Sequence, residues 1–313
     1  DIISAIRRCY DVAEDAEITI ECNPGSVMRH KLAAYKKAGI NRLSIGLQSA
    51  DNAELKLLGR IHSYEEFLKT YQAARMEKFD NINVDLINCI PMQSMTSWRK
   101  TLRSVTMLKP EHISIYNMII EPGTPFYEMK QEGVLMMPSE DEQAEIDEFT
   151  RSFMKKSGYE RYEFSNWAKP GHACRHNLGY WQGVQYLGFG IGAASYMNGC
   201  RWKNTSSIEE YIYAHFEEDG MLAVQEIRRE FKELSREEKM EEFMFLGLRC
   251  TAGVSEMNFK GRFGVGIADV YGEQLAKYTA MGLMEHEGGR YRLSERGIEV
   301  SNIILSDFLL DRN

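Results

Sequence analysis

The stretch Asn81–Pro91 reads Asn-Ile-Asn-Val-Asp-Leu-Ile-Asn-Cys-Ile-Pro and predicts a buried strand that ends in a proline turn. A short β-rich run of this kind, set between two helical patterns, is typical of a parallel sheet. The run contains Asp85, and a carboxylate inside an apolar strand is costly unless it binds something. Asp85 is therefore the first candidate functional residue.

Three other stretches share this design, because each is an apolar strand with a polar residue near its end. They are Ile18–Pro24 with Glu21 and Asn23, Arg42–Gln48 with Gln48, and His112–Ile120 with Asn117. The intervals between the four strands are long enough for crossover helices. The pattern predicts an α/β fold, as a βα barrel or an open sheet, with a site along its carboxyl-terminal edge.

Length and charge restrict the class of protein. The 313 residues suit one large domain and a smaller one, and no apolar run approaches the roughly 18 residues of a spanning helix. The net charge of −8 argues against a general affinity for nucleic acid or anionic membrane. Six cysteines are scattered singly, which predicts a cytoplasmic chain without a disulfide framework.

The second half of the chain changes in character twice. We expect a partial βα barrel over residues 1–165, an extension rich in glycine and aromatic residues over 166–220, and a mainly helical domain over 221–313. The last part combines helices with a hairpin around Gly288-Gly289, which predicts a winged-helix-like module. From residue 235 onward it holds 10 Lys and Arg against 13 Asp and Glu, so we expect a docking or packing lid rather than a DNA reader.

Three predicted strands carry polar side chains at comparable depths, at Glu21, Gln48 and Asp85. Strand ends converge at the ligand edge of a parallel sheet, and carboxylate and amide groups there suit ribose hydroxyls or an amino group. Arg60 follows the strand of Gln48 and could clamp a carboxylate. Each polar group taken alone is better explained as a cap of a neighbouring loop, whereas the three together favour a ligand site.

Two glycine-containing segments are further candidates. If Gly171–His176 is extended, then His172, Cys174 and His176 share one face and could ligate a metal or a haem. Their spacing is not a standard zinc pattern and no fourth ligand is evident, so the alternative that these side chains bind no metal stays open. Gly188-Phe-Gly-Ile-Gly192 does not follow the dinucleotide pattern, and we interpret it as close backbone packing or approach to a ligand.

Taken together, the motifs resemble the radical S-adenosylmethionine (SAM) family. The matching stretches are Ile18-Thr-Ile-Glu-Cys-Asn-Pro-Gly, Gly39-Ile-Asn-Arg-Leu-Ser-Ile-Gly-Leu-Gln-Ser, Leu58-Gly-Arg-Ile-His and Asn83-Val-Asp-Leu-Ile. More narrowly, the chain looks like the oxygen-independent coproporphyrinogen III oxidase-like branch. His176-Asn-Leu-Gly-Tyr-Trp181 is similar to the His-Asn-x-x-Tyr-Trp motif of the HemW-type haem chaperones in that branch. The resemblance implies a partial (β/α) barrel of radical SAM type.

The resemblance also implies binding residues. Glu21, Gln48, Arg60 and Asp85 would line a SAM pocket, with Gln48 and Asp85 toward the ribose and the backbone near Ile119 and Ala194 completing it. His176 would belong to a haem-associated motif. The resemblance leaves open whether the haem ligand is His176, His172, Cys174 or a methionine. Relatives often have His where this chain has Ala194, which weakens the role of that position.

The family's [4Fe–4S] cluster is held by a Cys-x-x-x-Cys-x-x-Cys triplet that this sequence does not contain. We expect the triplet to precede Asp1, and the chain as given to hold no cluster and to be inactive alone.

Two functions share the scaffold. One is a chaperone that binds haem and SAM and delivers haem to acceptors such as respiratory enzymes, with peripheral membrane association through those partners. The other is an enzyme that decarboxylates coproporphyrinogen side chains, so whether the protein is an enzyme stays open. A third hypothesis, a winged-helix DNA binder, conflicts with the charge of the tail.

Overall fold

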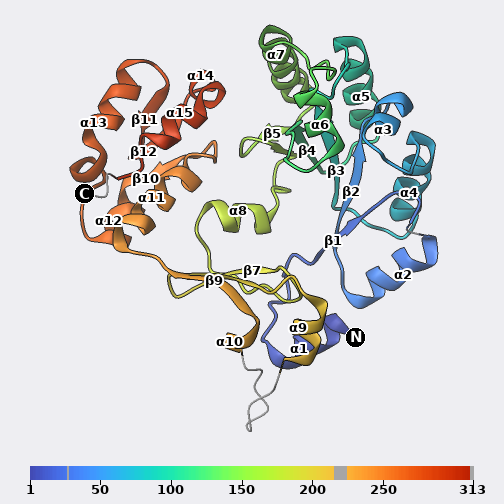
Figure 1. Ribbon diagram of the computed structural model, residues 1–313, viewed down its shortest axis with the longest axis horizontal. Helices are drawn as coiled ribbons and strands as arrows, with labels where there is room; N and C mark the ends of the chain where they lie inside the picture. Colours follow the sequence, from blue (N-terminus) through green and yellow to red (C-terminus); the bar gives the residue numbers. More distant parts are fainter. Residues whose placement is uncertain (27, 215–223, 311–313) are drawn as a thin grey trace. The chain divides into compact units, whose positions relative to one another are not determined.

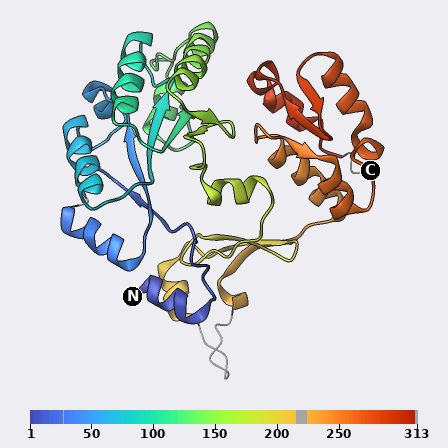
Figure 2. The ribbon, with the colours of Figure 1, turned by 180° about the vertical axis from the view of Figure 1, so that it is seen from behind.

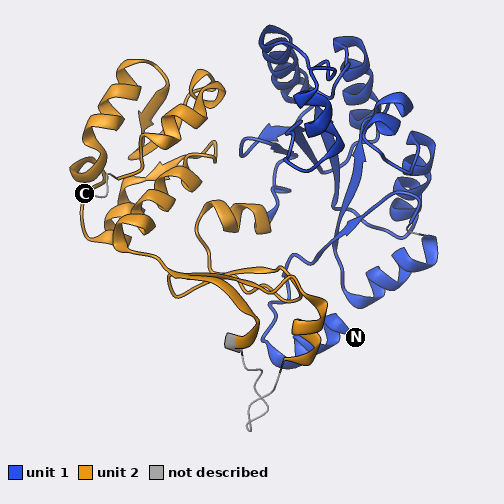
Figure 3. Ribbon diagram, in the orientation of Figure 1, with its two compact units in different colours: residues 1–174 blue, residues 175–313 orange. Residues whose placement is uncertain are grey.

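The computed structural model describes all residues except 27, 215–223 and 311–313, and it forms two compact units (Figure 3). Unit 1 comprises Asp1–Cys174 and unit 2 comprises Arg175–Asn313. The division expected from sequence, into 1–165, 166–220 and 221–313, stays a prediction. Its second boundary, near Gly220, lies outside the described residues.

The four predicted parallel strands form the centre of unit 1 and are confirmed. They lie side by side in chain order as β1 (Thr19–Cys22), β2 (Arg42–Gln48), β3 (Ile82–Asn88) and β4 (His112–Asn117). Two short antiparallel strands extend this sheet beyond β4: first β6 (Asn166–Ala168), then β5 (Glu160–Arg161). The alternation of residues 159–164 predicts a strand, of which the structure forms the two residues of β5 and a single bridge residue, Glu163.

Helices fill the intervals between the parallel strands, as predicted. The helices of unit 1 are α1 (Ile2–Cys9), α2 (Arg29–Ala38), α3 (Asn52–Leu57), α4 (Tyr64–Met76), α5 (Met95–Met107), α6 (Pro125–Gln131) and α7 (Glu140–Lys156). The spacing of Ser63 and Glu66 predicts a capping box, and this box opens α4. The sequence also predicts a helix that starts at Thr96 or Ser97; this start is wrong, because the Ser94 hydroxyl accepts a hydrogen bond from the Ser97 N–H and begins α5 earlier.

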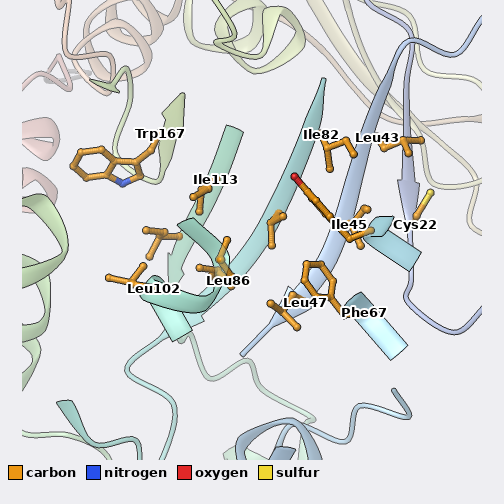
Figure 4. Close-up of a cluster of buried hydrophobic side chains, with 14 of the residues drawn as sticks. Cys22, Leu43, Ile45, Leu47, Phe67, Ile82, Leu86, Leu102, Ile113 and Trp167 are labelled. Carbon is orange, nitrogen blue, oxygen red and sulfur yellow. The ribbon is translucent and has the colours of Figure 1, made fainter. Parts of the chain in front are cut away.

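The sheet of unit 1 has one apolar and one polar face. Paired residues of neighbouring strands point to the same side, so the register determines each face. The apolar face buries Leu43, Ile45, Ile82, Val84 and Ile113 in the core, part of which Figure 4 shows. The helices α2, α4 and α5 lie on one side of the sheet in the two opposite views (Figures 1 and 2). Each fully buried aliphatic side chain stabilises the fold by about 1.5–3 kcal/mol. The opposite face carries the polar row Glu21, Ser44, Asn83 and His112.

Unit 2 contains two small antiparallel sheets with helices around them. Its strands pair in the orders β7–β8–β9 and β10–β12–β11. The strand bounds are β7 (Ala194–Met197), β8 (Cys200–Asn204), β9 (Arg228–Glu233), β10 (Val254–Ser255), β11 (Met284–Glu287) and β12 (Arg290–Leu293). The helices are α8 (Arg175–Trp181), α9 (Ile208–Tyr213), α10 (Val224–Ile227), α11 (Arg236–Gly247), α12 (Glu256–Phe263), α13 (Ile267–Ala280), α14 (Glu295–Glu299) and α15 (Ser301–Ser306).

The carboxyl-terminal part of unit 2 follows the predicted pattern, with a helical region and a hairpin at Gly288-Gly289. The sequence at the end of the chain predicts a single helix from about Glu295 to Leu310, and this prediction is wrong. Val300 has non-helical backbone angles and divides it into α14 and α15, so that Ile304 and Phe308 are fully buried. Within the described residues, none of the helices combines the length and the hydropathy needed to cross a bilayer.

Candidate functional site

Glu21, Gln48 and Asp85 lie on three neighbouring strands of unit 1, namely β1, β2 and β3. Glu21 pairs with Ser44, and Asp85 pairs with Gly46, so Glu21 and Asp85 both point to the polar face. The structure therefore brings the predicted carboxylates to one side of the sheet instead of dispersing them. Their role in binding SAM stays a prediction.

Gln48 reaches the same face through an irregular strand end. The register between β2 and β3 shifts between Gly46 and Gln48, and Gln48 has a positive φ of 73°. A Cβ added to Gly46 would lie 2.9 Å from the Gln48 Nε2 atom, so the glycine makes room for this amide. Leu47, between Gly46 and Gln48, points to the other side of the sheet and is fully buried in the apolar core. The bulge thus turns the Gln48 amide back over Gly46, beside the position of Asp85.

The carboxylate of Asp85 is held from behind by two donors. Its Oδ1 atom accepts a hydrogen bond from Asn83 Nδ2 at 2.8 Å, and its Oδ2 atom accepts one from Ser44 Oγ at 2.9 Å. Each carboxylate oxygen has a further lone pair, so the group retains acceptor capacity for two donors of a ligand. This geometry suits adjacent hydroxyls such as those of a ribose.

Tyr116, near the end of β4, lies close enough to several carboxylates for their charge to affect its pKa. Desolvation of the phenol is the first cause that raises the pKa of Tyr116, and a hydrogen bond with Ser114 opposes it. Three carboxylates raise this pKa further, those of Asp85, Glu163 and Glu21. A face with three acidic groups near one phenol favours ligands that donate hydrogen bonds or carry positive charge.

Two further candidates of unit 1 lie beyond the strands. Arg60 follows α3, and its guanidinium makes no hydrogen bond or ion pair within the described residues, so it is available to an anionic group. Ile119 follows β4 and is 73% exposed. Its neighbour Met118 donates a backbone hydrogen bond to Asn88 O at 3.0 Å, which ties this segment to the end of β3. The position of Ile119 beside a strand end agrees with a backbone role.

His176 lies in the first turn of α8 in unit 2. Its ring meets the ring of Tyr180 edge-on at 4.5 Å between centroids, as expected for positions i and i+4 of a helix. Tyr180 meets Tyr186 in the same way at 4.6 Å. The His-Asn-x-x-Tyr-Trp motif is therefore a helical motif whose histidine and tyrosine share a face.

The expectation that His172, Cys174 and His176 share one face of an extended segment is wrong. The chain is irregular from 172 to 174 and helical from Arg175, so a period of two does not hold. The Cys174 thiol is buried and donates to Glu17 Oε1 at 3.4 Å. No group of three or more His, Cys, Asp or Glu side chains in the described parts of the chain is arranged to hold a metal ion.

The glycine-rich stretch Gly188–Gly192 is a packing feature, as interpreted from the sequence. A Cβ at Gly188 would lie 2.2 Å from the carbonyl oxygen of Ala194, so only glycine fits there. Ala194 itself is the exposed first residue of β7. A role for Ala194 beside a SAM molecule stays a prediction.

Several polar residues of the unit 1 face were not selected from the sequence. They are Ser44, Asn83, His112, Ser114 and Tyr162. The available signal was the alternation within each strand, since Asn83 and Asp85 are two residues apart, as are His112 and Ser114. A period of two distinguishes a strand with one polar face from one that is buried on both faces.

Comparison with known proteins identifies the family. Residues 1–105 match the radical SAM superfamily, and residues 234–300 match the HemN C-terminal domain. The chain is 33% identical to the heme chaperone HemW of Lactococcus lactis, over 99% of this chain and 80% of that protein. It is 34% identical to HemW of Bacillus subtilis, over 98% of this chain and 80% of that protein. This chain belongs to the HemW family of radical SAM proteins.

The fold agrees with this membership. The solved structure of coproporphyrinogen III oxidase (HemN) from Escherichia coli superposes with a TM-score of 0.79 over 98% of this chain and 73% of that one, at 22% identity. A mouse protein, radical S-adenosyl methionine domain-containing protein 1, is 32% identical over 98% of this chain and 71% of its own length. The superfamily implies SAM and a [4Fe–4S] cluster as cofactors.

The two implied cofactors fit this HemW-family chain unequally. The polar face of unit 1 fits a nucleoside, because the Asp85 carboxylate is oriented and the Gln48 amide has its space at Gly46. The cysteines do not fit a cluster, since none are spaced as the triplet requires. Burial also raises the pKa of Cys22 to about 11 and that of Cys89 to about 12, which disfavours the thiolate that iron needs. No step of a mechanism is therefore assigned to a cluster in these residues.

Proposed function

We propose that this protein is a haem chaperone that binds haem and SAM and transfers haem to acceptor proteins. The observation that carries the proposal is the identity of about a third to proteins named heme chaperone HemW, over nearly the whole chain. The His-Asn-x-x-Tyr-Trp motif on α8 supports it, because it presents an imidazole and a phenol on one helical face. The acceptors would be haem proteins such as respiratory enzymes, reached from the cytoplasm.

In this proposal the residues of unit 1 bind the nucleoside. Asp85 would accept hydrogen bonds from the ribose hydroxyls, Gln48 would bind beside it, and Glu21 would attract the positive part of SAM. Arg60 would pair with the carboxylate of the methionine moiety. SAM supplies a sulfonium that can be cleaved by one-electron reduction when a cluster is bound; the residues described here only bind and orient it.

Haem titration of the full-length protein tests the proposal. We expect wild type to shift the Soret band of haem. If the exposed imidazole of His176 ligates the iron, His176→Ala should lose that shift. His30→Ala is a matched control that removes an exposed histidine on α2 of unit 1. An unchanged spectrum in His176→Ala would direct attention to His172, Cys174 or a methionine. Absence of haem binding by wild type would reject the proposal.

A further inference from the structure

A chain of polar groups, buried at His112, Asn83 and Ser44, lies behind Asp85 and crosses three strands of unit 1. His112 on β4 contacts Asn83 on β3 through Nδ1 and Oδ1 at 2.6 Å. The other ring nitrogen, Nε2, lies 2.8 Å from the hydroxyl of Tyr162. Asn83 then contacts Asp85 and Ser44 through Nδ2, each at 2.8 Å. The chain thus connects Tyr162, His112, Asn83 and Asp85 without a gap.

The direction of every hydrogen bond in this chain follows from Asp85. A carboxylate only accepts hydrogen bonds, so the NH₂ group of Asn83 faces it and the Oδ1 atom of Asn83 faces His112. That oxygen also only accepts, so the Nδ1 atom of His112 carries the hydrogen. In the neutral ring Nε2 then accepts from the Tyr162 hydroxyl. Asp85 therefore sets the amide orientation of Asn83 and the tautomer of His112, and the Tyr162 hydroxyl completes the chain by donating to Nε2.

The burial of these groups indicates that they serve Asp85 rather than the core. His112 is 0% exposed and Asn83 is 2% exposed, although both lie on the face opposite to the apolar core. Replacing a complete buried polar set by apolar groups is often neutral or stabilising, so folding alone does not require it. What the set achieves is a single orientation of the Asp85 carboxylate, with Asn83 on Oδ1 and Ser44 on Oδ2.

We propose that Tyr162, His112 and Asn83 are positioning residues that hold Asp85 in the one orientation that receives both hydroxyls of a ribose. The inference rests on the proposed function, because the ribose is that of SAM. Each member of the chain donates a hydrogen bond to the next, from Tyr162 to His112, from His112 to Asn83 and from Asn83 to Asp85. Without the Tyr162 hydroxyl, the Nε2 atom of His112 loses its hydrogen-bond donor, so the tautomer with the hydrogen on Nδ1 is less favoured. When Nδ1 carries no hydrogen, the Asn83 oxygen keeps only the longer hydrogen bond from Ser114 Oγ at 3.2 Å, and Asn83 holds Asp85 less firmly.

Calorimetric titration of the full-length protein tests this, with S-adenosylhomocysteine and its 2′,3′-dideoxy analogue as probes. We expect wild type to bind the ribose compound more tightly than the analogue. Asn83→Asp places a carboxylate against Asp85, and we expect at least a tenfold weaker affinity for the ribose compound with little change for the analogue. Tyr162→Phe removes one hydroxyl only, and we expect a two- to fivefold loss in the same sense. Tyr159→Phe is the matched control, because its buried hydroxyl donates to Pro110 O instead, and both affinities should persist.

The ratio of the two affinities separates positioning from damage to the fold. A variant that is merely destabilised loses affinity for both compounds equally, and thermal unfolding of each variant reports that loss directly. If wild type discriminates and both Asn83→Asp and Tyr162→Phe retain its ratio, the positioning role is overturned and the proposed function stands. If wild type binds neither compound, SAM binding itself is rejected, and the positioning role with it.

Discussion

Asp85 is the single side chain on which the binding face of unit 1 depends. It lies in a strand whose other neighbours, Val84 and Leu86, are fully buried in the core. Its two hydrogen bonds to Asn83 and Ser44 come from strand positions two residues back and one strand across. What the face can bind therefore depends on this one residue and on the register of β3, because a one-residue shift of β3 would turn Asp85 into the core.

Substitution of Asp85 tests the binding role directly. We expect Asp85→Ala in the full-length protein to weaken SAM binding about 10- to 100-fold, since hydrogen bonds to a charged group contribute roughly 1.5–3 kcal/mol each. Equilibrium dialysis with labelled SAM measures this. Asp80→Ala removes an exposed carboxylate just before β3 and serves as the control. Equal affinities of Asp85→Ala and wild type would contradict the pocket assignment.

His112 makes the stability of the chain depend on pH. Desolvation is the main cause that lowers the pKa of His112 well below 6.5, and the charges of Arg42 and His172 lower it further. The unfolded chain then binds a proton that the native chain does not, so the free energy of unfolding falls as the pH drops below about 6.5. We expect a slope of up to about 1.4 kcal/mol per pH unit for this group, down to its lowered native pKa.

Urea unfolding at a series of pH values measures this slope. His112→Gln should be less stable at neutral pH and should depend less on pH between about 5 and 6.5. His62, whose pKa is also lowered by desolvation, adds a smaller contribution of the same sign in both proteins. Parallel slopes for wild type and His112→Gln would show that His112 is not the source.

At the scale of elements, local signals predict capped helix starts but not how strand pairing distorts the backbone. Ser63 and Ser235 each stand three residues before a glutamate, a spacing that predicts a capping box, and these boxes begin α4 and α11. The end of β2 at Gln48 was predicted, but its bulge was not, because the bulge depends on the pairing with β3. The close approach of Gly188 to the Ala194 carbonyl likewise joins two segments of unit 2 that only the fold brings together.

Gly188 gives a prediction at this scale. We expect Gly188→Ala to destabilise the protein by about 1–3 kcal/mol, because the added Cβ would overlap the carbonyl oxygen of Ala194 and force the backbone to shift. Gly261→Ala is the control within the same unit, since a Cβ at this position in α12 meets no atom within 4 Å and alanine favours helix. Thermal unfolding compares them. A stable Gly188→Ala would mean that the two segments separate easily.

At the scale of the whole molecule, the chain combines a parallel sheet that suits a nucleoside with a second unit that carries the His-Asn-x-x-Tyr-Trp helix. The fold alone does not choose between a haem chaperone and a coproporphyrinogen oxidase, because the structural likeness to HemN is at 22% identity. The relatives named HemW favour the chaperone. The net charge of −8 still predicts that neither nucleic acid nor an anionic membrane is a direct partner.

An anaerobic assay separates the two functions. We expect the full-length, reconstituted protein to bind haem but to show no turnover of coproporphyrinogen, because the sequence matches chaperones over nearly its whole length. Release of carbon dioxide and formation of protoporphyrinogen would be measured, with an authentic oxidase as the positive control. Robust turnover would reject the chaperone function for this chain.

Sequence alone determined the four parallel strands, the helices between the strands and the family. Apolar periodicity and capping residues act within a few positions, so they can be read without coordinates. It also selected Glu21, Gln48 and Asp85 as polar residues of three neighbouring strands. Only the tertiary structure decided that Tyr162, His112 and Asn83 stand behind Asp85, since Asn83 and His112 are 29 residues apart in the chain, His112 and Tyr162 are 50 apart, and they meet through strand register. It also decided that the segment after Cys174 is a helix, because side-chain alternation in a short polar stretch does not specify its backbone.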